Sequence, residues 1–122
     1  MLSEEIDDNE YLYRRVIINP NFWDTDKNLP TSAVFKDSNG VSVDRQGERN
    51  EEKILKEFLK YELKAVVSIK TDTCKDLDTH PVYLPVDYNI YHSEIHESTE
   101  KKRLSSSKAK KLRDNCKVVF KV

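Results

Sequence analysis

The sequence predicts an α+β fold, a small, mixed, mainly antiparallel sheet with two main helices packed on it. Strand-like segments outnumber helical ones, in the order β, β-hairpin, α, β, short α, β, α, β. Residues 50–63 and about 105–116 have the apolar spacing of helices. The chain has 122 residues, 37% of them hydrophobic, which suits one core and a single domain over residues 10–122. Residues 1–9 predict a flexible acidic tail.

Residues 10–18, EYLYRRVII, predict the first strand because they are rich in β-branched and aromatic side chains. Asn19-Pro20-Asn21 ends it, since proline has no ladder donor. A loop then reaches residue 30, and its Phe22 and Trp23 are expected to pack back on the body.

Residues 32–45, SAVFKDSNGVSVDR, predict a β-hairpin. Asn39-Gly40 supplies the left-handed backbone angles of a tight turn, and apolar residues alternate on both sides. The buried faces would carry Ala33, Phe35, Val41 and Val43, with Ser42 and Asp44 opposite.

Residues 50–63 predict a helix with Asn50 as N-cap and acidic residues in its first turn. Its apolar stripe would comprise Ile54, Leu55, Phe58, Leu59 and Leu63. Residues 65–71 predict a strand, followed by a short helical turn through Leu77.

The later part of the chain predicts four further elements. Two prolines make the segment around residues 78–88 an extended edge or loop. Residues 89–96 predict a strand, residues 105–116 a helix with Ala109, Leu112 and Cys116 inward, and residues 117–122 a last strand.

A net charge of −1 conceals a separation of charge along the chain. Residues 1–100 hold 12 Lys and Arg against 21 Asp and Glu, and residues 101–122 hold nine against one. The basic end would attract phosphates or an acidic protein surface, including a second copy of this chain, unless it is simply a solvated helix. Its candidate partner-binding residues are Lys101, Lys102, Arg103, Lys108, Lys110, Lys111 and Arg113.

Several classes of protein are not expected. No apolar run approaches the length of a membrane span, and the acidic N-terminus does not resemble a signal peptide. Two cysteines are too few for a disulfide scaffold, so we expect a cytoplasmic protein with small, buried thiols. With only two glycines the chain has no P-loop and no dinucleotide-binding fingerprint, and we expect neither a cofactor nor a metal.

Candidate chemistry lies on the predicted strands. Arg14 and Arg15 would point to opposite faces of the first strand, and a guanidinium there either binds an anion or forms a structural ion pair. His92, Glu94 and His96 would share one strand face, suited to acid–base work or zinc, or simply exposed. Serines Ser32 and Ser42 of the hairpin could orient a substrate or face solvent.

The run LYRR, SAVFKD, SVDR and YH resembles the pattern of a family of small uncharacterised bacterial proteins. The resemblance covers residues 11 to about 96 and implies a stand-alone accessory domain. It nominates Arg14, Arg15, Ser32, Phe35, Ser42 and His92 as positions to test. An arginine on the first strand before a serine-bearing hairpin is also similar to ADP-ribosyltransferase-type domains, although the glutamate or second histidine of that family has no located counterpart.

Two functions follow as hypotheses. The first is a binding module that associates with a protein or nucleic acid through its charged surfaces. The second is a small enzyme or ligand-binding domain for a nucleotide or other phosphorylated molecule. In the second, Arg14 or Arg15 would hold the anion, His92 would act as acid or base, and Ser32 or Ser42 would orient the substrate.

Overall fold

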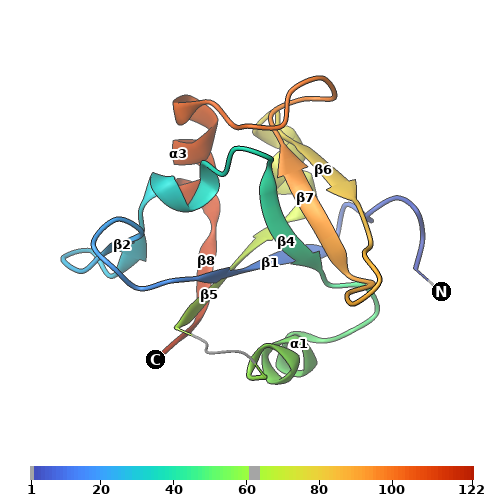
Figure 1. The fold of residues 1–122 in the computed structure, drawn as a ribbon, viewed down its shortest axis with the longest axis horizontal. Helices are drawn as coiled ribbons and strands as arrows, with labels where there is room; N and C mark the ends of the chain where they lie inside the picture. The colour runs from blue at the N-terminus through green and yellow to red at the C-terminus, as the bar shows by residue number, and fades with distance from the viewer. Residues whose placement is uncertain (1, 61–63) are drawn as a thin grey trace.

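Six strands form one antiparallel sheet in the order β6-β7-β4-β1-β5-β8, with a two-stranded β2-β3 ribbon beside it (Figure 1). The computed structural model describes residues 2–60 and 64–122. Its elements are β1 (Tyr11–Val16), β2 (Trp23–Asp24), β3 (Leu29–Pro30), the 3-10 helix η1 (Ser32–Phe35), β4 (Val41–Arg45), α1 (Glu51–Phe58), β5 (Ala65–Lys70), α2 (Thr71–Asp76), β6 (His80–Tyr83), β7 (His92–His96), α3 (Ser106–Asn115) and β8 (Lys117–Lys121). The predicted α+β class is confirmed.

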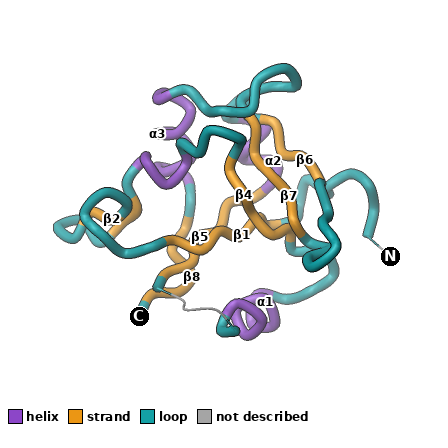
Figure 2. The backbone as a smooth tube through the Cα atoms, in the orientation of Figure 1, coloured by secondary structure: helices purple, strands orange, loops and turns teal. Residues whose placement is uncertain are grey.

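Helices lie on both faces of the sheet (Figure 2). The protein therefore has two hydrophobic cores of unequal size, one on each face. The larger core lies between the sheet and α3, η1 and the 17–31 loop, and Trp23 of that loop is buried in it. The smaller core lies under α1, where Ile54 and Phe58 pack on Tyr13 and Val66. Among the described residues, α1 packs on only part of this face, around Tyr13 and Val66.

The predicted hairpin over residues 32–45 is wrong in its first half. Residues 32–35 form η1 instead of a strand, and β4 pairs with β1 and β7. The physical reason is that neighbouring residues Val34 and Phe35 are both buried, whereas a strand would turn one of them outward. Gly40 still adopts a positive φ of 94°, and a Cβ there would come within 2.6 Å of His96 Cδ2.

The helix predicted over residues 50–63 is shorter than expected. Asn50 is its N-cap, as predicted, and its Oδ1 accepts from the Lys53 amide at 2.9 Å. The stripe residue Leu59 is the C-cap and is 59% exposed, so its predicted burial is wrong. Leu63 lies outside the described residues.

The other predicted elements are present with small shifts in their ends. The edge strand β6, the strands β5, β7 and β8, and the helices α2 and α3 all form where the sequence predicts them. Ser105 caps α3 by accepting from the Lys108 amide at 3.2 Å. Within the described residues, no helix is long and apolar enough to cross a membrane.

Strand β1 pairs unequally with its two neighbours. It pairs with β5 along its whole length, from Tyr11↔Lys70 to Val16↔Ala65. With β4 it pairs only at Leu12↔Arg45 and Tyr13↔Asp44. Beyond Tyr13 the two strands therefore diverge. A space opens between them next to α1, whose Phe58 lines it.

The acidic N-terminal segment packs against the body through a buried arginine. Arg45, 2% exposed, donates to both carboxylate oxygens of Glu10 at 3.0 and 2.5 Å. It also donates to the backbone oxygen of Ser3 at 2.6 Å. Ile6 is buried nearby in the larger core. The flexibility expected of residues 1–9 stays a prediction, but this segment supplies partners for Arg45.

Candidate functional site

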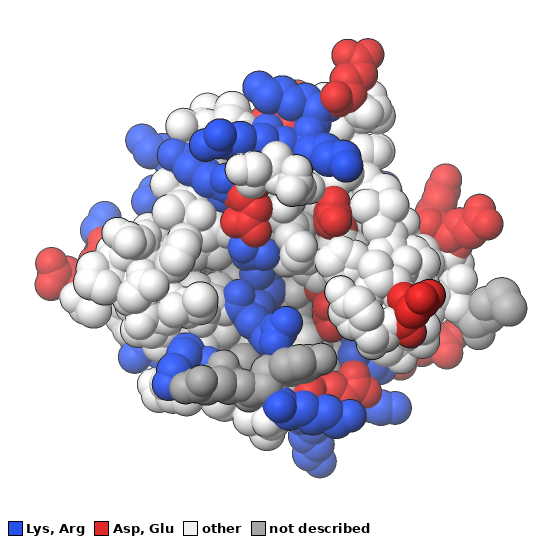
Figure 3. Space-filling model, in the orientation of Figure 1, with Lys and Arg blue, Asp and Glu red and all other residues white. Residues whose placement is uncertain are grey.

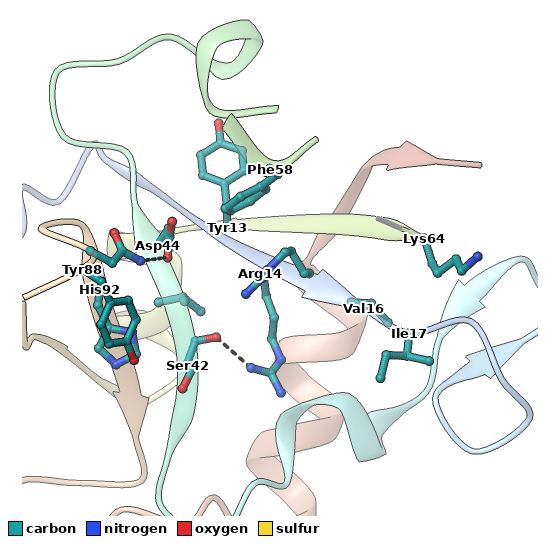
Figure 4. A pocket seen from close by; sticks show the side chains of 13 residues that line it. Tyr13, Arg14, Val16, Ile17, Ser42, Asp44, Phe58, Lys64, Tyr88 and His92 are labelled. Atoms are coloured by element: carbon teal, nitrogen blue, oxygen red, sulfur yellow. Dashed lines mark hydrogen bonds between the residues drawn. The ribbon is translucent and has the colours of Figure 1, made fainter. Parts of the chain in front are cut away.

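A cavity of about 500 Å³ lies where β1 and β4 diverge (Figure 4). We call it the arginine cavity. It is lined by Tyr13, Arg14, Arg15, Val16, Ile17, Ser42, Val43, Asp44, Phe58, Lys64, Tyr88, Asn89 and His92. It brings together four of the five predicted site residues: Arg14, Arg15, Ser42 and His92. The fifth, Ser32, begins η1 and does not line the cavity.

Arg14 bridges the diverging strands. Its Nη1 donates to the Ser42 backbone oxygen at 2.7 Å, and its Nε donates to that of Val34 at 3.0 Å. Its Nη2 forms an ion pair with Asp37 at 2.8 Å. The guanidinium thus replaces the ladder hydrogen bonds that β1 and β4 lose as they part, and the side chain stays 17% exposed at the cavity wall.

Arg15, on the opposite face of the sheet from Arg14, and Lys64 add positive charge to the cavity. The Arg15 guanidinium carbon lies 5.8 Å from the Phe58 ring centroid of α1. Lys64 lies just before β5 at one end of the cavity (Figure 4). Among the described residues that line the cavity, Arg14, Arg15 and Lys64 are cationic and Asp44 is acidic. Cations gathered around a concave surface raise the local concentration of anions.

His92 belongs to a hydrogen-bonded row on β7. Its Nε2 lies 3.3 Å from Glu94 Oε2, and His96 Nε2 lies 2.7 Å from Glu94 Oε1. Burial opposes ionisation of Glu94, but its hydrogen bonds with His96 and His92 outweigh burial and lower its pKa. The three side chains share one face, as predicted. Nevertheless, no group of three or more His, Cys, Asp or Glu in residues 2–60 and 64–122 is arranged to hold a metal ion.

Tyr13 is the buried phenol of the site. Its hydroxyl donates to Glu51 Oε1 of α1 at 3.1 Å. Burial, together with the nearby Glu51 charge, raises the pKa of Tyr13 well above its usual value. Tyr13 is therefore a neutral hydrogen-bonding group at physiological pH and does not act as a base.

Sequence reasoning missed Lys64, Phe58, Tyr88 and Asn89 as site residues. Asp44 could have been found, because alternation along β4 places it on the same face as Ser42. The others reach the cavity from the end of α1, the start of β5 and the turn between β6 and β7. No local pattern in the sequence predicts that these three connections meet.

The basic C-terminal part forms a separate surface. Five of the predicted partner-binding cations are exposed there, and we call them the basic surface: Lys101, Lys102, Arg103, Lys110 and Lys111. Figure 3 shows Lys and Arg atoms gathered along the top of the molecule, and again in the hollow at the centre of this face.

Two of the predicted partner-binding residues already have partners within the chain. Lys108 Nζ lies 2.9 Å from Glu97 Oε2. Its hydrogen bond to Glu97 raises the Lys108 pKa. Arg113 forms an ion pair with Asp114 at 2.9 Å. Lys108 thereby links α3 to the segment after β7, and both side chains contribute less to the basic surface.

Comparison with known protein families, with curated proteins and with solved structures finds no match for this chain.

Proposed function

We propose that the protein binds a phosphorylated small molecule in the arginine cavity. The observation that carries the proposal is the convergence of Arg14, Arg15 and Lys64 with Ser42 and His92 on one concave site. A volume of about 500 Å³ lies within the range of small-molecule sites. Guanidinium groups offer planar, paired donors that match phosphate oxygens, and the lysine adds a point charge.

The charged side chains are unevenly distributed along the arginine cavity. In Figure 4, Lys64 lies at one end of the cavity, Tyr88 and His92 at the other, and Arg14 between them. Asp44 lies on the Tyr88 side, where a carboxylate would repel a phosphate. The phosphate is therefore placed between the arginines and Lys64, and the rest of the molecule extends toward Asp44.

His92 brings an imidazole to this site, a side chain that can serve as a general acid or base. Its hydrogen bond to Glu94 holds the ring by Nε2, as a carboxylate does in orienting a catalytic imidazole. We therefore extend the proposal to acid–base chemistry by His92 on the bound molecule, with Ser42 as a hydrogen-bonding group. The binding step is tested independently of this extension.

Replacing Arg15 by alanine is expected to weaken binding of ribose 5-phosphate by roughly 10- to 100-fold, because one charge-assisted hydrogen bond contributes about 1.5–3 kcal/mol. The Lys64→Ala variant should show a smaller loss. Isothermal titration calorimetry at low ionic strength measures both, with ribose as the uncharged comparison.

Lys27→Ala is the matched control, since Lys27 is an exposed lysine outside the cavity. Equal affinity of wild type, Arg15→Ala and Lys27→Ala for ribose 5-phosphate would contradict the proposal. So would equal binding of ribose and its phosphate.

The basic surface supports a second candidate function, association with an anionic macromolecule. The favouring observation is that five cations from two consecutive segments, residues 101–103 and α3, are exposed together. Such a surface attracts phosphate backbones or acidic protein patches through long-range, salt-dependent forces.

Reversing two charges, Lys110→Glu with Lys111→Glu, is expected to weaken binding of a labelled twelve-nucleotide RNA at 50 mM salt and to flatten the salt dependence of that binding. Fluorescence anisotropy measures this, with a poly-glutamate peptide as the alternative polyanion. The matched control reverses Lys53 and Lys56 on α1, which are also exposed. If both double variants lose the same affinity, net charge alone is responsible and the proposed surface is refuted.

A further inference from the structure

Beside the arginine cavity lies a second hollow of about 320 Å³. We call it the tyrosine pocket. The two share Asp44, Phe58, Tyr88 and Asn89 in their walls, so they are adjacent compartments. The tyrosine pocket adds Tyr91 and Ile90 to these walls.

The shared wall contains an aromatic ring that packing does not explain. Tyr88 is 90% exposed, the most exposed of the large hydrophobic side chains described. Exposing a whole aromatic ring forgoes the stabilisation that burial would bring. A ring kept in solvent at the boundary of two hollows is suited to stack against a planar ligand.

The turn that carries Tyr88 is firmly braced. The backbones of Val86 and Asn89 exchange hydrogen bonds at 3.1 and 3.0 Å, which places Tyr88 at the tip of a tight turn. The Asn89 side chain donates to Asp44 Oδ1 at 2.9 Å, and Tyr83 Oη donates to the Ile90 backbone oxygen at 2.6 Å. The aromatic ring is thus presented by a preorganised support, which lowers the entropy lost on binding.

The two compartments differ in chemistry. Among the described lining residues, the cations of the arginine cavity are Arg14, Arg15 and Lys64. The tyrosine pocket combines aromatic and aliphatic walls with charged side chains of both signs, and its Arg49 guanidinium is stacked 3.4 Å from the Tyr91 ring centroid. Asp44 stands in the wall between them with carboxylate oxygens that accept hydrogen bonds. A ligand that fits both would carry a phosphate at one end, hydroxyls in the middle and a flat ring at the other end.

We infer that the ligand of this site is a nucleoside phosphate. The arginines and Lys64 hold the phosphate, Asp44 accepts from the ribose hydroxyls, and the base stacks on Tyr88 in the tyrosine pocket. The inference rests on the proposed function, because it needs the arginine cavity to bind phosphate. Beyond phosphate binding, it specifies that the ligand is a nucleoside phosphate.

The test compares AMP with ribose 5-phosphate by calorimetry. Because stacking on an aromatic side chain gives a base a substantial share of its affinity, AMP is expected to bind roughly 10- to 100-fold more tightly than ribose 5-phosphate. Tyr88→Ala should remove this preference, so that AMP binds no more tightly than ribose 5-phosphate. Tyr88→Phe should retain the preference. Leu84→Ala is the matched control, since Leu84 is an exposed residue of the same hairpin that lines neither compartment.

The possible outcomes separate the two proposals. Equal affinities for AMP and ribose 5-phosphate, unaffected by Tyr88→Ala, overturn the nucleoside inference and leave phosphate binding standing. Failure of both molecules to bind overturns the proposed function and the inference together. A tetranucleotide with a terminal phosphate identifies the source of the nucleotide. Tighter binding than AMP, lost in Tyr88→Ala, supports a unit of a nucleic-acid strand, and weaker binding supports a free nucleotide.

Discussion

Glu10→Ala is expected to lower the free energy of unfolding by about 3–5 kcal/mol, because it leaves the Arg45 guanidinium buried without a counter-charge. Arg45 is 2% exposed, and both oxygens of the Glu10 carboxylate accept from it. The same carboxylate also accepts from the Gly47 amide at 2.9 Å. Urea denaturation followed by circular dichroism measures the loss.

Two variants show whether the buried charge is the cause. Glu10→Leu combined with Arg45→Met removes both charges and should be more stable than Glu10→Ala. Lys56→Ala removes one partner of the exposed pair Lys56–Glu52 and should cost about 0.5 kcal/mol or less. If Glu10→Ala costs no more than Lys56→Ala, the Arg45–Glu10 pair does not have the structural role described.

The same ion pair predicts how stability depends on pH. Burial opposes ionisation of Glu10, but hydrogen bonds from Arg45 and from the Gly47 amide together lower its pKa below the usual 4.5. A lowered pKa in the folded state stabilises the fold fully above pH 4.5. That contribution is lost as the pH falls through the lower, folded-state value. In Glu10→Ala the dependence below pH 4.5 should accordingly be shallower than in the wild type.

Arg14→Met is expected to weaken both the fold and the site. It leaves the backbone oxygens of Val34 and Ser42 without this donor, and each unsatisfied group costs about 1–3 kcal/mol where water cannot replace it. It also removes one of the cations that line the arginine cavity. We expect a lower melting temperature and at least a tenfold loss of affinity for ribose 5-phosphate, measured by differential scanning fluorimetry and calorimetry.

Arg14→Lys separates charge from geometry. The ammonium group keeps the positive charge but cannot reach Val34, Ser42 and Asp37 in the forked pattern of a guanidinium. Its melting temperature should lie close to that of Arg14→Met, while its phosphate affinity should be partly restored. A lysine variant with wild-type stability would show that Arg14 does not bridge the strands.

Periodicity predicted most of the secondary structure because most elements face one core. The α3 helix and β4 bury Ala109, Leu112, Val41 and Val43 where their spacing predicts. The failure at residues 32–35 has a non-local cause, since Val34 is held by a hydrogen bond from Arg14 on another strand. The alternation that buries Val41 and Val43 also directs the Arg45 side chain toward the core. A guanidinium can be buried there because it pairs with Glu10, which lies 35 residues away in the sequence.

The candidate site was predictable only where its residues lie on strands. Arg14, Arg15, Ser42 and His92 were nominated for their chemistry, and they converge because β4 lies between β1 and β7 in the sheet. Ser32 was nominated as part of a hairpin that does not form. Lys64 and Tyr88 belong to connections whose positions depend on the whole fold, so no pattern near them in the sequence indicates their role.

The short pairing between β1 and β4 divides the sheet into two mechanical units. Strands β6, β7 and β4 form one unit and β1, β5 and β8 the other, joined by the shortest ladder among the sheet's described pairs. Arg14, Arg15 and Lys64 belong to the second unit, whereas Ser42, Asp44, Tyr88 and His92 belong to the first or to its turn. A ligand that contacts both units would hold them together at the short β1–β4 pairing. It would therefore slow amide hydrogen exchange in both β1 and β4.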